Sequence, residues 1–186
     1  MSQRNSTYIR KKRDLYETPE WVTEALLPHL PAVCLIMEPA AGTGKMVRIL
    51  ERDAKVWAQD IEPDPCLHAV GDFRQSTIST SCGVCHGIVT NPPFELATEF
   101  IEHALRLTEP VNGFVAMLLR TDFDHAKSRT HLFRDCPAFS KKLVLMKRIV
   151  WFVEDDGKPK ASPSYNHAWF LWNHQHEGQP TLAYAA

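Results

Sequence analysis

The chain has 186 residues, of which 44% are hydrophobic, 23% charged and 10% aromatic. This balance is typical of one globular domain and excludes disordered, fibrous and membrane-spanning proteins. The charged start of the chain has no apolar stretch behind it, so we expect a cytoplasmic protein without a secretory signal. A domain of this size is stable without disulfides, so the five cysteines can stay reduced.

The net charge is −1, but the basic residues gather in two segments. Residues 1–13 contain five basic and no acidic residues, and residues 120–148 contain eight basic and three acidic ones. Because the remainder is acidic, this pattern indicates a polyanion that docks on one side of the protein. A flexible basic tail beside a solvated helix face is the alternative explanation.

In chain order, Thr18 and Pro19 predict the start of a helix, with Thr18 as N-cap, that runs to about His29. Short apolar runs then alternate with amphipathic segments. The predicted strands are 33–37, 55–59, 66–70, 87–90 and 113–119, and the predicted helices between them are 45–52 and 95–107. Strands 143–152 and 167–172 are expected to form a hairpin around the polar loop 154–166.

This alternation predicts an α/β fold, a mostly parallel sheet with helices on both faces and a C-terminal antiparallel hairpin. We find no internal repeat and no Gly-, Ser- or Pro-rich linker. We therefore expect one domain over residues 14–175, between a basic flexible tail at 1–13 and a C-terminal tail at 176–186.

Ligands of open parallel sheets bind beyond the carboxyl ends of the strands. The turn Glu38-Pro-Ala-Ala-Gly42-Thr-Gly44 follows the first predicted strand, so its glycines let the backbone approach a ligand. It has neither the Gly-Lys-Ser/Thr ending of a phosphate-binding loop nor a third glycine at the dinucleotide spacing. The carboxylate suits a ligand that carries a positive charge.

Asp60 ends the second predicted strand, where an acidic side chain can accept hydrogen bonds from both hydroxyls of a ribose. Ile61 could cover one face of an adenine. An ordinary polar turn at this position is the alternative.

The segment Asn91-Pro92-Pro93-Phe94 follows the fourth predicted strand, and its two prolines stiffen the backbone. The Asn91 side-chain oxygen and the Pro92 carbonyl can together accept both hydrogens of a planar amino group. Phe94 offers a ring on which a base can stack.

The order of these motifs resembles S-adenosylmethionine-dependent amino methyltransferases, in particular DNA N6-adenine methyltransferases. The resemblance covers about residues 16–172 and implies a Rossmann-like class I fold with seven strands. It implies Asn91, Pro92, Pro93 and Phe94 as the catalytic tetrapeptide. The cofactor-binding residues that it implies are Tyr16, Thr18, Pro19, Glu38, Ala40, Gly42, Gly44, Asp60, Ile61, Asp72, Phe73 and Asn91.

The resemblance also implies direct methyl transfer to the N6 amino group of an adenine that is flipped out of DNA. The residues left to hold phosphates are Arg10, Lys11, Lys12, Arg13, Arg120, Lys147 and Arg148. Members with defined target sequences carry a separate recognition region that this chain lacks. We therefore expect low sequence specificity or a very short target sequence, as in small phage and prophage methyltransferases. The oligomeric state could be a monomer or a dimer.

Three other functions share parts of this pattern. Asn-Pro-Pro-aromatic segments also occur in RNA methyltransferases (adenine N6 or guanine N2) and in enzymes that methylate a glutamine of release factors. The latter typically have an additional helical domain, and a protein substrate does not explain two basic segments. An inactive nucleic-acid-binding subunit with this fold is the alternative outside enzymes.

The cysteines suggest a weaker hypothesis. Cys82-Gly-Val-Cys85-His86 matches the haem attachment pattern, which requires an exported chain. Zinc would take Cys66, Cys82, Cys85 and His86 as ligands, but without a second Cys-x-x-Cys we expect reduced cysteines and no metal. Trp151, Trp169 and Trp172 are expected in the core, with the alternative that one of them lines the DNA face.

Overall fold

A computed structural model describes residues 16–151 and 165–185 of the chain. Its strands are β1 (Leu35–Glu38), β2 (Lys55–Asp60), β3 (Ala69–Val70), β4 (Ser79–Thr80), β5 (Gly83–Val84), β6 (Gly87–Thr90), β7 (Phe114–Arg120), β8 (Phe139–Leu145), β9 (His167–Asn173) and β10 (Thr181–Ala185). The α-helices are α1 (Glu20–Glu24), α2 (Lys45–Leu50) and α3 (Ala97–Thr108). Short 3-10 helices are η2 (Leu27–His29), η3 (Phe73–Gln75), η4 (Phe94–Leu96), η5 (Glu109–Val111), η6 (Phe123–His125) and η7 (Lys127–Leu132).

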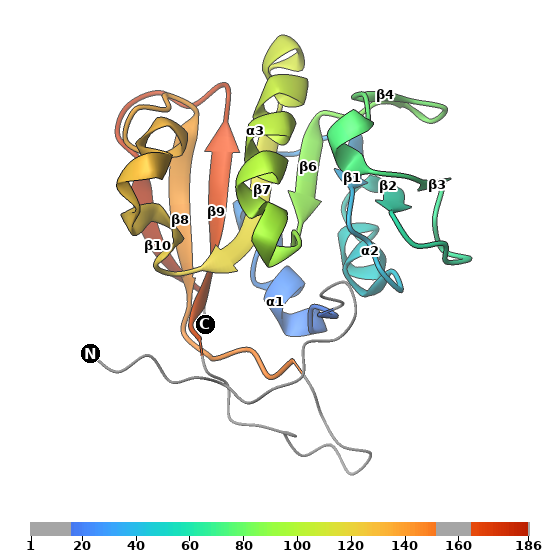
Figure 1. Cartoon of the computed structure of the whole chain (residues 1–186), viewed down its shortest axis with the longest axis horizontal. Coiled ribbons are helices and arrows are strands. Elements are labelled where there is room, and N and C mark those ends of the chain that lie inside the picture. Colours follow the sequence, from blue (N-terminus) through green and yellow to red (C-terminus); the bar gives the residue numbers. More distant parts are fainter. Residues whose placement is uncertain (1–15, 152–164, 186) are drawn as a thin grey trace.

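Eight strands of the described chain form one twisted sheet in the order β10-β8-β9-β7-β6-β1-β2-β3 (Figure 1). β9 runs antiparallel to both of its neighbours, and the other neighbouring pairs of this sheet are parallel. The predicted α/β class, with a mostly parallel sheet and an antiparallel hairpin, is therefore confirmed.

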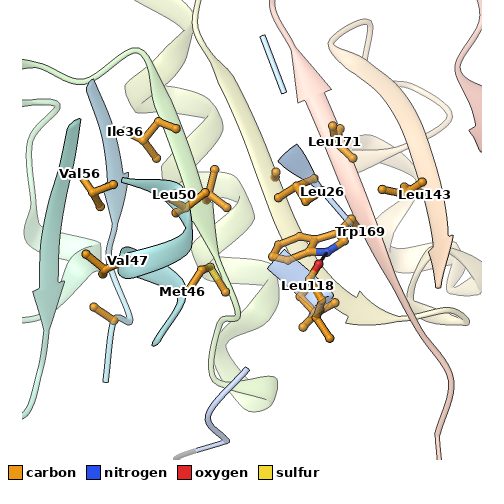
Figure 2. Packing of buried hydrophobic residues seen from close by; sticks show 14 of the residues in the cluster. Leu26, Ile36, Met46, Val47, Leu50, Val56, Leu118, Leu143, Trp169 and Leu171 are labelled. Atoms are coloured by element: carbon orange, nitrogen blue, oxygen red, sulfur yellow. Dashed lines mark hydrogen bonds between the residues drawn. The ribbon is translucent and has the colours of Figure 1, made fainter. Parts of the chain in front are cut away.

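The central strands are apolar on both faces because helices cover both. In β7, Ala116 and Leu118 pack on the side of α1 and α2, whereas Val115 and Met117 pack on the side of α3. On the first side Trp169 fills the space between the helices and the sheet, and its Nε1 donates a hydrogen bond of 2.9 Å to the Val22 carbonyl (Figure 2). This packing holds α1 beneath the strand ends that carry the site (Figure 1).

The parallel registers place the carboxyl ends of β1, β2, β6, β7 and β8 at one edge of the sheet, together with the start of β9. All the predicted catalytic residues follow strands that end at this edge, which we call the carboxyl edge. No helix in the described ranges is long and apolar enough to cross a bilayer.

The first helix is shorter than the sequence predicts. Pro19 is extended and takes the N-cap position without a side-chain hydrogen bond, so α1 begins at Glu20, and Thr18 is not the cap. The helix gives way to the 3-10 helix η2 at Leu27 because Pro28 has no backbone N–H to continue the α-helical pattern.

The predicted strand bounds are wrong at two further places. β8 covers 139–145 instead of 143–152, because the polar residues Ser140, Lys141 and Lys142 hide its first half from an apolar pattern. Phe152 lies outside the described residues. The strand predicted over 66–70 shrinks to β3, because Asp64 accepts from the backbone N–H groups of Cys66 and Leu67 and holds a turn there.

The predicted C-terminal tail is wrong for its last part. Thr181–Ala185 forms β10, which pairs in parallel with β8 and adds an eighth strand to the seven expected. Its five residues carry no clear apolar alternation, so the pairing depends on the open hydrogen-bonding edge of β8 and on the packing of Ala183 and Ala185 against the core. The predicted basic tail 1–13 and most of the loop 154–166 lie outside the described residues.

Candidate active site

Three of the predicted motifs line one pocket at the carboxyl edge. Its walls come from the segment before α1, from the loop between β1 and α2 with the first turn of α2, and from the residue after β6. The lining residues are Tyr16, Glu17, Thr18, Ala40, Ala41, Gly42, Thr43, Lys45, Met46 and Asn91. A larger hollow around Cys34 and Asn112 opens at the opposite edge, where none of the predicted catalytic or cofactor-binding residues lies.

The glycine loop wraps against the end of β2. Gly42 donates its backbone N–H to Asp60 Oδ2 at 2.8 Å, and Ala41 donates to the Gln59 carbonyl at 3.0 Å. Gly44 has φ +76°, and a Cβ there would lie 2.9 Å from the Cys66 sulfur. The loop thus needs glycine at 44 for both its backbone conformation and its packing.

Glu38, the last residue of β1, is a fully buried carboxyl group. Its Oε1 accepts hydrogen bonds from Thr90 Oγ1 at 2.6 Å and from the Ala40 N–H at 3.1 Å, whereas Oε2 has no partner among the described residues. Burial raises the pKa of Glu38 to about 8, although these two hydrogen bonds oppose the shift. An unpaired buried oxygen of this kind is a place for a ligand's donor.

Asp60 ends β2, half-buried, where burial raises its pKa. Besides Gly42 it accepts from the Glu62 N–H through Oδ1 at 3.0 Å. A carboxylate has about four acceptor positions, so Asp60 retains capacity for a ligand's hydroxyl groups. The neighbouring Ile61 is 55% exposed, so its apolar side chain is accessible to a ligand bound at Asp60.

The predicted adenine-contact residues after β3 behave differently from one another. Asp72 caps η3 through Arg74 N and pairs with the Arg74 guanidinium at 2.7 Å, which is the main reason why its pKa is lowered. The Phe73 side chain is buried against Phe100 and His103 in the core, so only its backbone is available to a ligand. The prediction of Phe73 as a binding residue therefore applies to its backbone alone.

Asn91 follows β6 and is held from the other side of the pocket. Its Nδ2 donates a hydrogen bond of 3.1 Å to the Tyr16 carbonyl. This bond orients the amide, and Oδ1 is left buried without a partner in the described structure. The stiff Pro92-Pro93 pair then leads into η4, which begins at Phe94.

Four rings form a cluster next to Asn91. The ring centroid of Phe94 lies 5.4 Å from that of Tyr16, 6.5 Å from that of Trp151 and 6.3 Å from that of His167. Burial lowers the pKa of His167 to about 4, and the Arg120 charge adds to this shift, so the ring is neutral near pH 7.

Sequence reasoning left Glu17 out of this site and expected Trp151 in the core. Trp151 is half-buried at the carboxyl edge, whereas Trp169 and Trp172 are fully buried as predicted. Trp151 was expected in the core because the predicted strand extended through it, with the alternative that one of the three tryptophans lines the DNA face; it packs partly buried against the core. Glu17 was passed over inside the segment Tyr16-Glu-Thr-Pro19, and it contacts both Thr43 and Lys45.

The predicted phosphate-binding residues in the described part lie near the same edge. Arg120 ends β7, pairs with Asp122 at 2.7 Å and lies 4.0 Å from the Tyr165 ring centroid. Lys147 and Arg148 are exposed in the segment after β8. Arg10, Lys11, Lys12 and Arg13 lie outside the described residues.

The four candidate zinc ligands are not brought together. Cys66 lies beside the glycine loop, Cys85 is buried in the core, and Cys82 and His86 are exposed. No cluster of three or more metal-binding side chains occurs over 16–151 and 165–185.

No protein-family model matches the chain, and no curated protein sequence matches it. Several solved structures are similar to the chain in fold. A protein of Listeria monocytogenes assigned to the class I S-adenosylmethionine-dependent methyltransferases has a TM-score of 0.62 at 16% identity, over 90% of this chain and 65% of that one. A type I restriction-modification methyltransferase subunit of Streptococcus thermophilus has a TM-score of 0.61 at 11% identity, over 87% and 45% of the two chains.

The 23S rRNA methyltransferase ErmE has a TM-score of 0.54 at 15% identity, over 89% of this chain and 70% of that one. The chain thus spans less than two thirds of the length of the Listeria and Streptococcus proteins. At these identities the likeness concerns the fold. The chain therefore has the fold of the class I S-adenosylmethionine-dependent methyltransferases.

Proposed function

We propose that the chain transfers a methyl group from S-adenosylmethionine to the N6 amino group of adenine in DNA. The observation that carries this proposal is the buried Oδ1 of Asn91, which has no partner among residues 16–151 and 165–185, beside a pocket lined by the glycine loop. A buried acceptor without a partner is costly, so it indicates a site for a donor that arrives with the substrate.

The residues at the carboxyl edge fit the cofactor part by part. Glu38 has one oxygen without a partner in the described part of the chain, which suits a cationic amino group, and the backbone of the glycine loop admits close approach. Asp60 has spare acceptor positions for ribose hydroxyls, and the exposed Ile61 offers an apolar face for the adenine ring. Asp72 could accept a hydrogen bond from the adenine amino group at an acceptor position that its pair with Arg74 does not use. The bound cofactor supplies a methyl group on a positively charged sulfur.

The protein's part in the reaction is to orient the acceptor. Asn91 Oδ1 and the Pro92 carbonyl accept the two hydrogens of the acceptor amine, so its lone pair is drawn out of the ring plane. The nitrogen would form its bond to the methyl carbon as the sulfur–methyl bond breaks, with that electron pair left on the sulfur as a neutral thioether, and would release one proton to water. No strong base is required, because positioning near the attack geometry supplies much of the acceleration.

The acceptor base must leave the helical stack to reach Asn91. Phe94 and Trp151 supply aromatic surface beside Asn91. Lys147 and Arg148 supply positive charge near the same edge for a nucleic-acid backbone. These features support a nucleic-acid substrate over a protein substrate.

The test is incubation with tritiated S-adenosylmethionine and separate pools of DNA, RNA and protein, followed by nucleoside analysis. We expect label in N6-methyladenine of DNA, lost in Asn91→Ala and kept in Asn112→Gly. The control residue has φ +48° at the opposite edge, a conformation that glycine adopts freely.

Label in RNA alone would favour the RNA methyltransferase alternative. Cofactor binding without transfer would favour an inactive nucleic-acid-binding subunit. Near-normal transfer by Asn91→Ala would contradict the proposed role of the tetrapeptide.

A further inference from the structure

We infer that residues 16–19, here called the strap, hold the glycine loop and Asn91 in register with each other, and that Glu17 is the positioning residue of this strap. The inference rests on the proposed function, because it concerns how the cofactor pocket and the acceptor site are joined. It starts from the position of the strap, which lines the pocket between the two groups.

One end of the linkage is polar. The Thr43 hydroxyl donates a hydrogen bond to Glu17 Oε1, and the Lys45 ammonium lies 2.9 Å from Glu17 Oε2. Thr43 belongs to the glycine loop and Lys45 is the first residue of α2, so one carboxylate bridges the strap to both. Arg48 Nη1 also donates to the Thr43 carbonyl at 3.2 Å, which secures the loop from the helix side.

The other end reaches the tetrapeptide. The Tyr16 carbonyl accepts the hydrogen bond from Asn91 Nδ2, and the Tyr16 ring contacts those of Phe94 and Trp151, with centroids 5.4 and 5.5 Å away. If the carbonyl moved away, Asn91 would lose the contact that determines which end of its amide faces the acceptor. The glycine loop is therefore joined to Asn91 through two consecutive residues of the strap.

A second ion pair in the same region provides a matched comparison. Glu24 on α1 pairs with Arg52 beyond α2 at 2.7 Å, and both pairs are about equally exposed. Exposed pairs alone contribute little to stability. Glu24 and Arg52 do not line the pocket. A variant that loses this pair therefore shows the effect of removing an exposed carboxylate while the strap stays intact.

The first experiment compares Glu17→Ala with Glu24→Ala. In calorimetric titration with S-adenosylmethionine, we expect Glu17→Ala to bind about tenfold more weakly, as for a lost hydrogen bond to a charged group. We expect its kcat on DNA to fall as well, because Asn91 loses its orientation. Glu24→Ala should stay within about twofold of the unaltered protein on both measures. Equal effects of the two variants would overturn the inference.

The second experiment tests the coupling. Asn91→Asp keeps an acceptor toward the substrate but places an oxygen against the Tyr16 carbonyl, so it should weaken cofactor binding through the strap. The double variant Glu17→Ala/Asn91→Asp should then bind the cofactor about as weakly as the weaker single variant. Losses that multiply would show that the two residues act independently and would overturn the inference.

Hydrogen exchange in the free protein separates this inference from the proposed function. We expect faster exchange over the peptide 16–26 in Glu17→Ala and no change in Glu24→Ala. If the unaltered protein bound no S-adenosylmethionine, the proposed function would fail, but the exchange rates would still show whether Glu17 holds the strap in place. Unchanged exchange in Glu17→Ala would refute the role of Glu17 in the strap.

Discussion

The Thr90 hydroxyl donates a buried hydrogen bond of 2.6 Å to Glu38 Oε1, and so joins the carboxyl ends of β6 and β1 through side chains. It satisfies one oxygen of Glu38 and leaves the other for a ligand. Glu38 is thus held in place at the cost of burying an ionisable group.

The first prediction concerns pH. Glu38 has a pKa of about 8 in the folded protein against an ordinary value of 4.5, so between these values the folded protein keeps a proton that the unfolded chain releases. This group's stabilising contribution is complete below pH 4.5 and is lost as pH rises through 8. We expect Glu38→Gln to match the unaltered protein near pH 5 and to be more stable above pH 8, as measured by urea unfolding.

Subtracting the two curves removes the titration of every other group, so the difference reports Glu38. A difference that did not vary between pH 5 and 8.5 would mean that Glu38 is ionised throughout. The same variant should bind S-adenosylmethionine more weakly, because Glu38 can release its proton when a cationic amino group binds, whereas the glutamine amide has no such proton and stays neutral.

The second prediction concerns the glycine loop. Gly44→Ala and Gly178→Ala both place an alanine at positive φ, +76° and +91°, at a cost of about 1–2 kcal/mol each in the free energy of unfolding. Only Gly44 is close to another side chain, the Cys66 sulfur, and only Gly44 belongs to the pocket loop. Calorimetry should therefore show weaker S-adenosylmethionine binding in Gly44→Ala alone.

Adding Cys66→Ala to Gly44→Ala removes the 2.9 Å contact with the sulfur and leaves only the Cys66 Cβ at 3.3 Å, so it should recover part of the affinity. If Gly178→Ala weakened cofactor binding equally, the loop would have no special role.

The third prediction concerns the aromatic cluster. Phe94→Ala and Trp151→Ala should each lower kcat/KM on DNA by about 1–3 kcal/mol, the range for loss of one base-stacking contact. Tyr184→Ala, at an exposed ring on the edge strand β10, serves as the control and should leave kcat/KM unchanged. A normal kcat/KM for Trp151→Ala would assign Trp151 to packing alone.

The fourth prediction concerns the nucleic-acid backbone. Lys147→Ala should weaken DNA binding about equally on unrelated sequences and reduce the slope of log K against log salt by about 1. Lys55→Ala removes an exposed lysine at the opposite edge of the sheet and should leave the slope unchanged. Fluorescence anisotropy titrations over a range of salt concentrations measure both. Equal slopes for Lys147→Ala and the unaltered protein would exclude a phosphate contact there.

Much of the fold follows from local pattern. β6 lies where the sequence predicts it, and β1, β2 and β7 lie within two residues of their predicted bounds, because a strand buried on both faces must be a continuous apolar run. The glycine loop and Asn91 could be identified because they follow such runs directly, and parallel strands bring their carboxyl ends to one edge.

Tertiary structure decided what depends on contacts between distant residues. β10 and the first half of β8 carry weak patterns, and each exists because a neighbouring strand supplies hydrogen bonds. The burial that raises the pKa of Glu38, the place of Trp151 beside Phe94, and the bridge from Glu17 to Thr43 and Lys45 all join separate segments. The sequence by itself determined which residues end the strands, because the burial pattern is local, whereas the charge state and orientation of those residues depend on what the folded chain packs against them.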